Sequence, residues 1–306
     1  TMPAAQPAGD SLAGRVVGTR VFGFSQGERA GRRDDFVRAV LRGALEAQYR
    51  SGMGRADYVD LLAAGSMPEA CRLPQRYRAD WLESYVSRLL GRDLREFSRL
   101  SDPRRLRSLL AGLAAAQGSE TVVARLGGAV NLSASTTTSY MELLRALHLV
   151  ERLPPWTPNL LKREVGRSKY LLTDSALAMR LTRTSPDTLK DLVRGGALGG
   201  LLEAFIAAEL MRQSTWCEER FTISHYRSPD GREIDLILEL DDGRVIAVEV
   251  KAASSASAAD ARHLRWLEER IGDRLVAGVV LTTDDRSRHL GGRLWAVPVA
   301  ALWELG

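Results

Sequence analysis

Two acidic residues and a lysine stand out in the segment GREIDLILELDDGRVIAVEVKA, which runs from Gly231 to Ala252. The segment alternates as two apolar strands do, yet Asp235 lies near its start and Glu249 and Lys251 lie near its end. Mg²⁺ accepts a few carboxylates and keeps waters for a phosphate substrate. A lysine beside such an ion can orient or help deprotonate its water, and the ion stabilises the charge that builds on the phosphate. The three residues therefore indicate phosphodiester hydrolysis at a Mg²⁺ or Mn²⁺ site.

The turn between these two strands decides which residues face each other. Residues 241–243 (Asp-Asp-Gly) fit a three-residue hairpin loop in which Gly243 takes the left-handed position. In this register Asp235 lies opposite Glu249, with Cβ atoms about 5 Å apart. A two-residue loop would place Asp235 across from Val250 and would mix the two faces, so the apolar pattern selects the first register. The apolar face then consists of Ile234, Leu236, Leu238, Ile246, Val248 and Val250.

A third carboxylate is expected on the helix that begins near Gly199. On a helical wheel Glu203 shares its face with apolar residues such as Ile206 and Leu210. A carboxylate in an apolar stripe usually needs a partner. Gly199, one turn earlier, leaves room beside it. Glu203 is therefore a candidate metal ligand, and a salt bridge to an arginine is the alternative.

Composition sets the wider limits. The chain has 306 residues, 45% of them hydrophobic, which favours two or three domains. The net charge of +5 permits a nucleic-acid partner without requiring one. Cys71 and Cys217 form no metal-spaced set, and no signal peptide or membrane-spanning run is recognisable, so a cytoplasmic protein without membrane contact is expected. Lysine occurs only at Lys162, Lys169, Lys190 and Lys251.

Periodicity predicts helices in the first half of the chain and mixed helices and strands in the second. On the long helix 75–97, we expect Trp81, Tyr85, Leu89 and Leu94 to face inward. The other expected helices are 34–50, 57–64, 103–116, 120–127, 134–147, one from 199, and 258–271. The expected strands are 16–24, 222–226, the hairpin, 275–281 and 295–299.

Helices 120–127 and 134–147, followed by strands within 148–156 and 163–174, have the order of a winged helix, and Ser133 is a suitable N-cap. Such a domain can dock on DNA through its last helix, or it can serve protein packing. That helix begins ASTTTS and has no Arg, Lys, Asn or Gln there to read base edges. Contacts to phosphate, which position without specifying sequence, are expected from Lys162, Arg163, Arg167 and Lys169.

The acid and lysine pattern resembles the PD-(D/E)xK restriction-endonuclease-like fold. The resemblance rests on Glu203 on a helix, Asp235 in GREIDLI, and the EVK at 249–251. It implies that Glu203, Asp235 and Glu249 bind metal and that Lys251 serves the attacking water. The literal PD of SPDGRE lies in a turn, so the metal ligand is assigned to Asp235, which alone lies opposite Glu249.

An ordered set of longer stretches resembles a large prokaryotic family of AAA-type ATPases, in which a P-loop domain precedes a winged helix and a nuclease-like domain. The chain has no G-x-x-x-x-G-K-[ST], which that family would have before DSLAGRV, so ATP binding requires the missing P-loop domain. The third helix also lacks the arginines often seen there. The resembling stretches are DSLAGRV, SYVSRLLGRDL, LSASTTTSYMELLRALHLVERLPPW, KYLLTDSALA, GGLLEAFIAAEL, GREIDLILE, AVEVKA and RLWAVPVAALW.

The expected fold is α/β and multidomain. The expected parts are a strand remnant of an ATPase core (1–30), a helical domain (31–100), a winged helix (101–170) and a PD-(D/E)xK nuclease-like domain (171–306). The expected function is that of a Mg²⁺- or Mn²⁺-dependent DNA endonuclease module of an AAA-type ATPase. The alternative is a non-catalytic nucleic-acid-binding or assembly module. DNA is the expected partner, and a homo-oligomer is left open.

Overall fold

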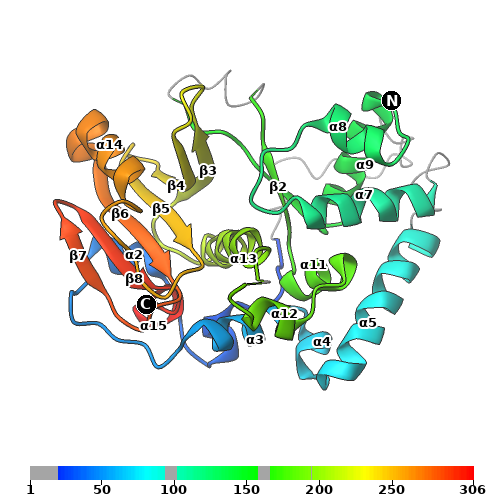
Figure 1. Cartoon of the computed structure of the whole chain (residues 1–306), viewed down its shortest axis with the longest axis horizontal. Helices are drawn as coiled ribbons and strands as arrows, with labels where there is room; N and C mark the ends of the chain where they lie inside the picture. The colour runs from blue at the N-terminus through cyan, green and yellow to red at the C-terminus, as the bar shows by residue number, and fades with distance from the viewer. Residues whose placement is uncertain (1–19, 94–101, 158–165, 194) are drawn as a thin grey trace, which may run out of the picture.

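The computed structural model describes residues 20–93, 102–157, 166–193 and 195–306. A helical part and a six-stranded sheet part lie side by side, with the long helix α13 (Leu198–Gln213) between them (Figure 1). This confirms the coarse expectation of a mixed α/β chain with an N-terminal helical region. Among the described residues, no helix combines the length and apolar character that crossing a bilayer requires.

The helical part begins with α3 (Arg55–Ala64), α4 (Pro68–Arg72) and α5 (Gln75–Arg88), which continues as the short π-helix η1 (Leu89–Asp93). Then follow α7 (Pro103–Ala115), α8 (Val123–Ala129) and α9 (Ala134–Ala146). Strands β1 (Val150–Leu153) and β2 (Lys169–Leu172) pair antiparallel, and α11 (Ser175–Thr182) and α12 (Pro186–Lys190) lead to α13. As the sequence predicts, the Ser133 side chain caps α9 by accepting from the amide of Thr136.

The inward face of α5 is broader than expected. Leu82 and Val86 are buried, and Leu90 of η1 continues their row. The expected residues Trp81, Tyr85 and Leu89 pack against the same core but are only partly buried, and Trp81 and Tyr85 stack on each other with ring centroids 5.3 Å apart. Residues four apart share a helix face, so both rows satisfy the same periodicity, and the packing of α5 on neighbouring helices such as α11 buries the aliphatic row more completely. Leu94 lies outside the described residues.

The N-terminal stretch contains two short helices in place of the longer elements expected. Residues 20–24 of the expected strand have no strand pairing, and 16–19 lie outside the described residues. Helix α1 spans Gln26–Arg29, and α2 spans only Phe36–Leu41 in place of 34–50. Gly43 ends α2 because it adopts φ +75° and its amide, with that of the next residue, closes back on the last turn.

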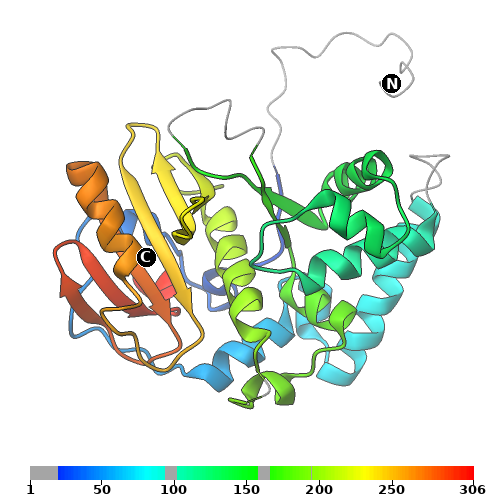
Figure 2. The same ribbon diagram turned by 45° about the horizontal axis from the view of Figure 1, so that its top comes forward.

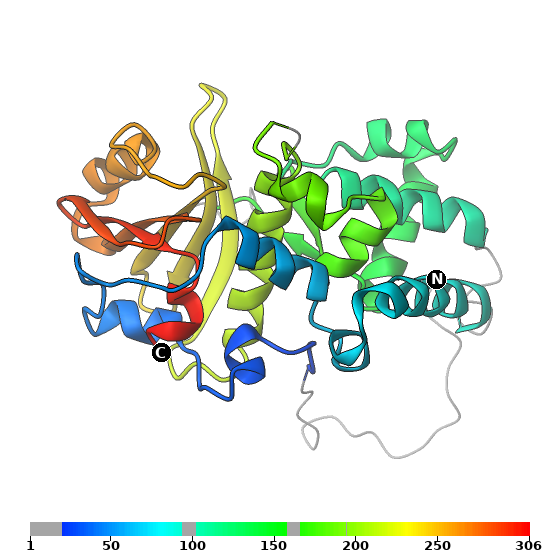
Figure 3. The same cartoon turned by 60° about the horizontal axis from the view of Figure 1, so that its bottom comes forward.

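This N-terminal stretch belongs structurally to the sheet part. Figure 3 shows α2 beside the C-terminal helix α15 (Ala301–Glu304), and the two are in contact. Buried polar side chains of α13 fix the stretch in place. Glu209 accepts from the amide of Gln26 at 2.8 Å, and Gln213 accepts from the amide of Phe36 while donating to the carbonyl of Leu302.

The sheet has the order β3-β4-β5-β6-β8-β7. Its bounds are β3 (Phe221–Arg227), β4 (Glu233–Leu240), β5 (Val245–Lys251), β6 (Leu275–Thr282), β7 (Arg288–Gly291) and β8 (Leu294–Pro298). The first three strands form antiparallel pairs, β5, β6 and β8 run parallel, and β7 is antiparallel to β8. Helix α13 covers one face, while α14 (Arg262–Ile271), followed by the 3-10 turn η2 (Gly272–Arg274), covers the other (Figure 2).

The hairpin of β4 and β5 has the register expected from the sequence. Leu236 pairs with Val248 and Leu238 with Ile246, and Gly243 adopts φ +82°. One expectation for this face is wrong. Ile234 packs on the α14 side, because a β-bulge opposite His225 inserts one extra residue into β4 and turns the preceding side chain over.

Candidate active site

The hairpin brings the first residues of β4 to the last residues of β5. The last observed pair of the hairpin is Leu236 with Val248, and Asp235 and Glu249 are the next residues beyond it on the two strands. The side chain of Asp235 turns to the backbone of β5, where one oxygen accepts from the amide of Val250 at 2.8 Å. The bulge in β4 lies at this position, and bulges of this kind commonly re-aim a side chain.

Glu249 is buried, with 4% of its surface exposed, and its two oxygens differ in their surroundings. Oε2 lies 3.2 Å from Nζ of Lys251, whose side chain is 36% exposed. Oε1 is buried without a hydrogen-bond partner. Nδ1 of His263 on α14 lies 3.8 Å from it. That nitrogen lies 2.7 Å from the carbonyl of Glu233, so it does not satisfy the carboxylate. Glu249 thus presents one unsatisfied acceptor beside Asp235.

Glu203 projects from α13 into the same region and meets a lysine. Its Oε1 lies 2.8 Å from Nζ of Lys169, which is completely buried on β2. The same Nζ lies 3.0 Å from Glu233 Oε1 and 3.8 Å from Asp235 Oδ1. The alternative of an ion pair for Glu203 is therefore realised, with a lysine in place of an arginine.

This position contradicts the expectation that Lys169 contacts DNA phosphate, because its ammonium group has no solvent exposure. Arg167 is exposed on the same segment, with its carbonyl 3.1 Å from Nε2 of His225. Lys162 and Arg163 lie outside the described residues. In α9, the hydroxyls of Thr137, Thr138 and Ser139 bond back to backbone carbonyls of the preceding turn.

A close backbone approach holds Glu203 near Lys169. The turn after α7 packs on the first turn of α13, where a Cβ on Gly200 would lie 2.3 Å from the carbonyl oxygen of Gln117. A Cβ on Gly118, which adopts φ +77°, would lie 2.8 Å from Oε2 of Glu203. Open space surrounds Gly199, the glycine expected to leave room beside Glu203, and it is Gly200 that makes the close contact.

Crowding of carboxylates shifts several pKa values. Burial, followed by repulsion from Asp235, raises the pKa of Glu203 and that of Glu249 to about 8. Burial also raises the pKa of Asp235. For Lys169, burial alone would lower the pKa, but attraction by Glu203 and the neighbouring acids outweighs it and raises the value. The ammonium group of Lys169 therefore stays charged.

Asp235 and Glu249 can serve as ligands of a divalent ion, but Glu203 cannot. Asp235 and the unsatisfied oxygen of Glu249 offer hard oxygen ligands of the kind that Mg²⁺ or Mn²⁺ takes along with water. Glu203 does not fit, because Lys169 already satisfies it. Among the described residues, no group of three or more His, Cys, Asp or Glu side chains is arranged to hold a metal ion.

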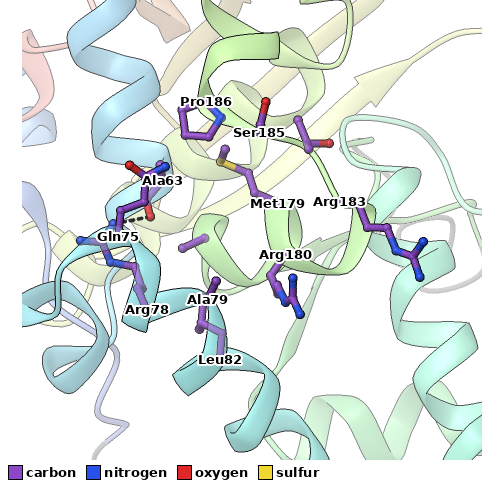
Figure 4. A pocket seen from close by; sticks show the side chains of 12 residues that line it. Ala63, Gln75, Arg78, Ala79, Leu82, Met179, Arg180, Arg183, Ser185 and Pro186 are labelled. Atoms are coloured by element: carbon purple, nitrogen blue, oxygen red, sulfur yellow. Dashed lines mark hydrogen bonds between the residues drawn. The ribbon is translucent and has the colours of Figure 1, made fainter.

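A separate hollow of about 370 Å³ lies between α5 and the α11–α12 region (Figure 4). Three arginines line it, but they have other partners or face solvent. Arg78 donates to the carbonyls of Ala63, Ala70 and Leu73, and Arg180 pairs with Glu83. We call Glu203, Glu233, Asp235 and Glu249 the acid cluster. The hollow shares no residue with this cluster, and we assign no role to it.

Comparisons with known proteins match both halves of the chain. Residues 55–188 match the Domain of unknown function DUF8612, and residues 198–302 match the Domain of unknown function DUF4143. The two matched regions do not overlap and follow each other along the chain. Lys169 lies in the first, whereas the carboxylates and Lys251 lie in the second.

Two curated mycobacterial proteins are distantly similar. They are Uncharacterized protein Rv2008c of Mycobacterium tuberculosis and Uncharacterized protein Mb2031c of Mycobacterium bovis. Each is 26% identical over 196 residues, which cover 64% of this chain and 43% of the relative. The matched region thus spans under half the length of these relatives. No solved structure matches the chain.

Proposed function

We propose that the sheet part is a metal-dependent nuclease module of the PD-(D/E)xK type that hydrolyses DNA phosphodiesters. The observation that carries this proposal is the buried, unsatisfied Oε1 of Glu249 beside Asp235 and Lys251. Buried acceptors in native proteins nearly always have partners, so an exception in an acid cluster points to a ligand. The placement of Glu203 on helix α13 and of Asp235 and Glu249 on the neighbouring strands β4 and β5 also supports the proposal, because the resemblance implies these positions.

In this proposal Asp235 and Glu249 would hold Mg²⁺ or Mn²⁺. The ion, when bound, supplies an activated water and balances charge on the phosphate. Lys251 is placed for the substrate side, because its side chain reaches solvent while its ammonium group donates to Glu249. It can hold the attacking water or a phosphate oxygen in position. The bulge in β4 keeps Asp235 turned toward β5.

Cleavage assays on plasmid DNA with Mg²⁺ or Mn²⁺ test the proposal. We expect Lys251→Met to lower the cleavage rate by about 10²-fold or more, as loss of a positioned proton-transfer group does, while Mn²⁺ binding persists. Glu249→Gln should remove both cleavage and Mn²⁺ binding. The matched control is Asp242→Asn, an exposed acid at the tip of the same hairpin that pairs with Arg244. Equal cleavage by all four proteins, or none by the wild type, would reject the nuclease assignment.

The preceding region is proposed to be a winged helix that binds DNA through its phosphates. The order α7, α8, α9, β1 and β2 supports this proposal, as does the exposed Arg167 beside β2. Following the resemblance, we also propose that the chain works within an AAA-type ATPase, where a P-loop part would supply ATP binding.

One observation favours a second candidate, a non-catalytic assembly module. Lys169 neutralises part of the acid cluster from within, as a structural ion pair does. In that case Mn²⁺ at millimolar concentration would neither bind nor raise the melting temperature. Binding of Mn²⁺ that depends on Glu249 would exclude this candidate.

A further inference from the structure

The acid cluster draws on both matched domains. Lys169 reaches it from β2, within residues 55–188, while Glu203, Glu233 and Asp235 lie within residues 198–302. The connection is firm, because the chain after β1 pairs with the edge strand β3. The amide of His225 donates to the carbonyl of Pro154 at 3.0 Å, and Pro155 forms a parallel bridge with the same residue. The sheet part alone would therefore lack this cation.

The ammonium group lies where oxygen ligands converge. Its Nζ is within 3.0 Å of Glu203 and Glu233, which belong to different elements, and 3.8 Å from Asp235. An ammonium group has three donors and one charge, so it can satisfy two carboxylates directly and a third electrostatically. A hard divalent ion of the Mg²⁺ type binds through one or two carboxylates and keeps waters, so Glu203 and Glu233 would offer it ligands if the ammonium group were absent.

Glu203 already has a partner in Lys169. Its Oε1 lies 2.8 Å from the ammonium nitrogen, and only 8% of its side chain is exposed. Glu249, in contrast, keeps Oε1 unsatisfied on the other side of Asp235. Within the cluster, the ammonium group of Lys169 thus partners Glu203 and Glu233, whereas Glu249 keeps an oxygen without a partner.

We propose that Lys169 is a built-in cation of the candidate site, whose ammonium group takes the place of a second divalent ion beside Glu203 and Glu233. The wild-type site then binds a single ion, at Asp235 and Glu249. This inference rests on the proposed metal site and is independent of whether DNA is cleaved. Lys169 is a positioning residue in this scheme: it fixes the number of ions and holds Glu203 away from the bound one.

The test counts Mn²⁺ ions per chain by calorimetry and measures the melting temperature with and without Mn²⁺. Lys169→Met removes the charge at similar volume and exposes three carboxylates to one another. We expect it to bind one Mn²⁺ more than the wild type. Mn²⁺ should raise its Tm further than that of the wild type, by roughly 5 °C at about 100 times the dissociation constant. If Lys169→Met folds only in the presence of Mn²⁺, a cooperative unfolding transition that appears on adding Mn²⁺ takes the place of the Tm comparison.

The matched control is the double variant Lys169→Met/Glu203→Gln, which removes the buried acid together with its partner. It should return to the wild-type number of ions. If Lys169→Met gains no ion and no extra thermal shift, or if the wild type already binds two ions, the inference is overturned. It is also overturned if the double variant keeps the gained ion. A wild type that binds no ion rejects both the metal site at Glu249 and the inference that rests on it, whereas a wild type that binds one ion beside a Lys169→Met variant that gains none rejects the inference alone.

Discussion

Replacing Gly200 by alanine tests how Glu203 is positioned. Gly200 is the third residue of α13, and a Cβ there would lie 2.3 Å from the carbonyl oxygen of Gln117 and 2.9 Å from its carbonyl carbon. These are backbone atoms, so the clash cannot be relieved by a side-chain rotation. Either α13 or the turn after α7 must move. The movement would separate the helix that carries Glu203 from the strand that carries Lys169.

The expected change in the unfolding free energy of Gly200→Ala follows from two opposing effects. Alanine is favoured over glycine inside a helix by up to about 1 kcal/mol. Inserting a methyl group into a packed backbone contact costs about 1–3 kcal/mol. The variant should therefore lose up to about 2 kcal/mol of unfolding free energy, or roughly 3–4 °C in Tm, because each kcal/mol shifts the Tm of a chain of this size by about 2 °C.

Gly199→Ala is the matched control, since it makes the same change one residue earlier, where nothing lies within 4 Å of the added Cβ. It should be neutral or slightly stabilising. Thermal unfolding, monitored by circular dichroism in the same buffer, compares the Tm values of the two variants. If Gly200→Ala melts at or above Gly199→Ala, the close approach of the turn and α13 is not a feature of the protein in solution.

Two further predictions concern pH and salt. Glu249 keeps its proton to about pH 8 when folded but releases it near its ordinary pKa of 4.5 when unfolded, so the folded state binds more protons between these values. Stability without metal should therefore fall as pH rises from about 5 to about 9, and Glu249→Gln should show a smaller fall in Tm across that range. A wild-type Tm that does not change over this pH range would contradict the burial of an ionisable Glu249. DNA binding should weaken steeply with salt and vary little with sequence, and Arg167→Ala should lower the salt slope by about 1, measured by fluorescence anisotropy. An unchanged slope would remove Arg167 from the interface.

The hairpin was predictable because two constraints act on it at once. The loop must place glycine at the left-handed position, and the apolar residues of both strands must share a face, so one register satisfies both. The unusual position of Glu203 was visible as a carboxylate in an apolar stripe. Its partner Lys169 was not, because the contact joins β2 to α13 and no local period encodes a pairing between separate elements. The nearby basic residues made Lys169 look like part of a DNA-binding surface.

The errors elsewhere have equally local causes. The bulge in β4 reverses Ile234, and a strict alternation cannot anticipate an inserted residue. On α5, the aromatic and aliphatic rows have the same period, so only the neighbouring helices decide which row is buried more completely. Helix α2 stops early because Gly43 forms a C-terminal cap, a role that the longer apolar periodicity conceals.

The polar contacts between α13 and the N-terminal stretch have a consequence for biosynthesis. Gln26 leaves the ribosome 183 residues before its partner Glu209. At about 5–20 residues per second, this interval is roughly ten to forty seconds. During that time the side chains of α13 that hold α1 and α2 have not been made, and the apolar side of α2, which includes Phe36 and Val40, lacks its partners in α13 and α15. The nascent chain therefore carries a segment whose packing partners are synthesised much later, and in this interval the segment is open to chaperone binding and to aggregation.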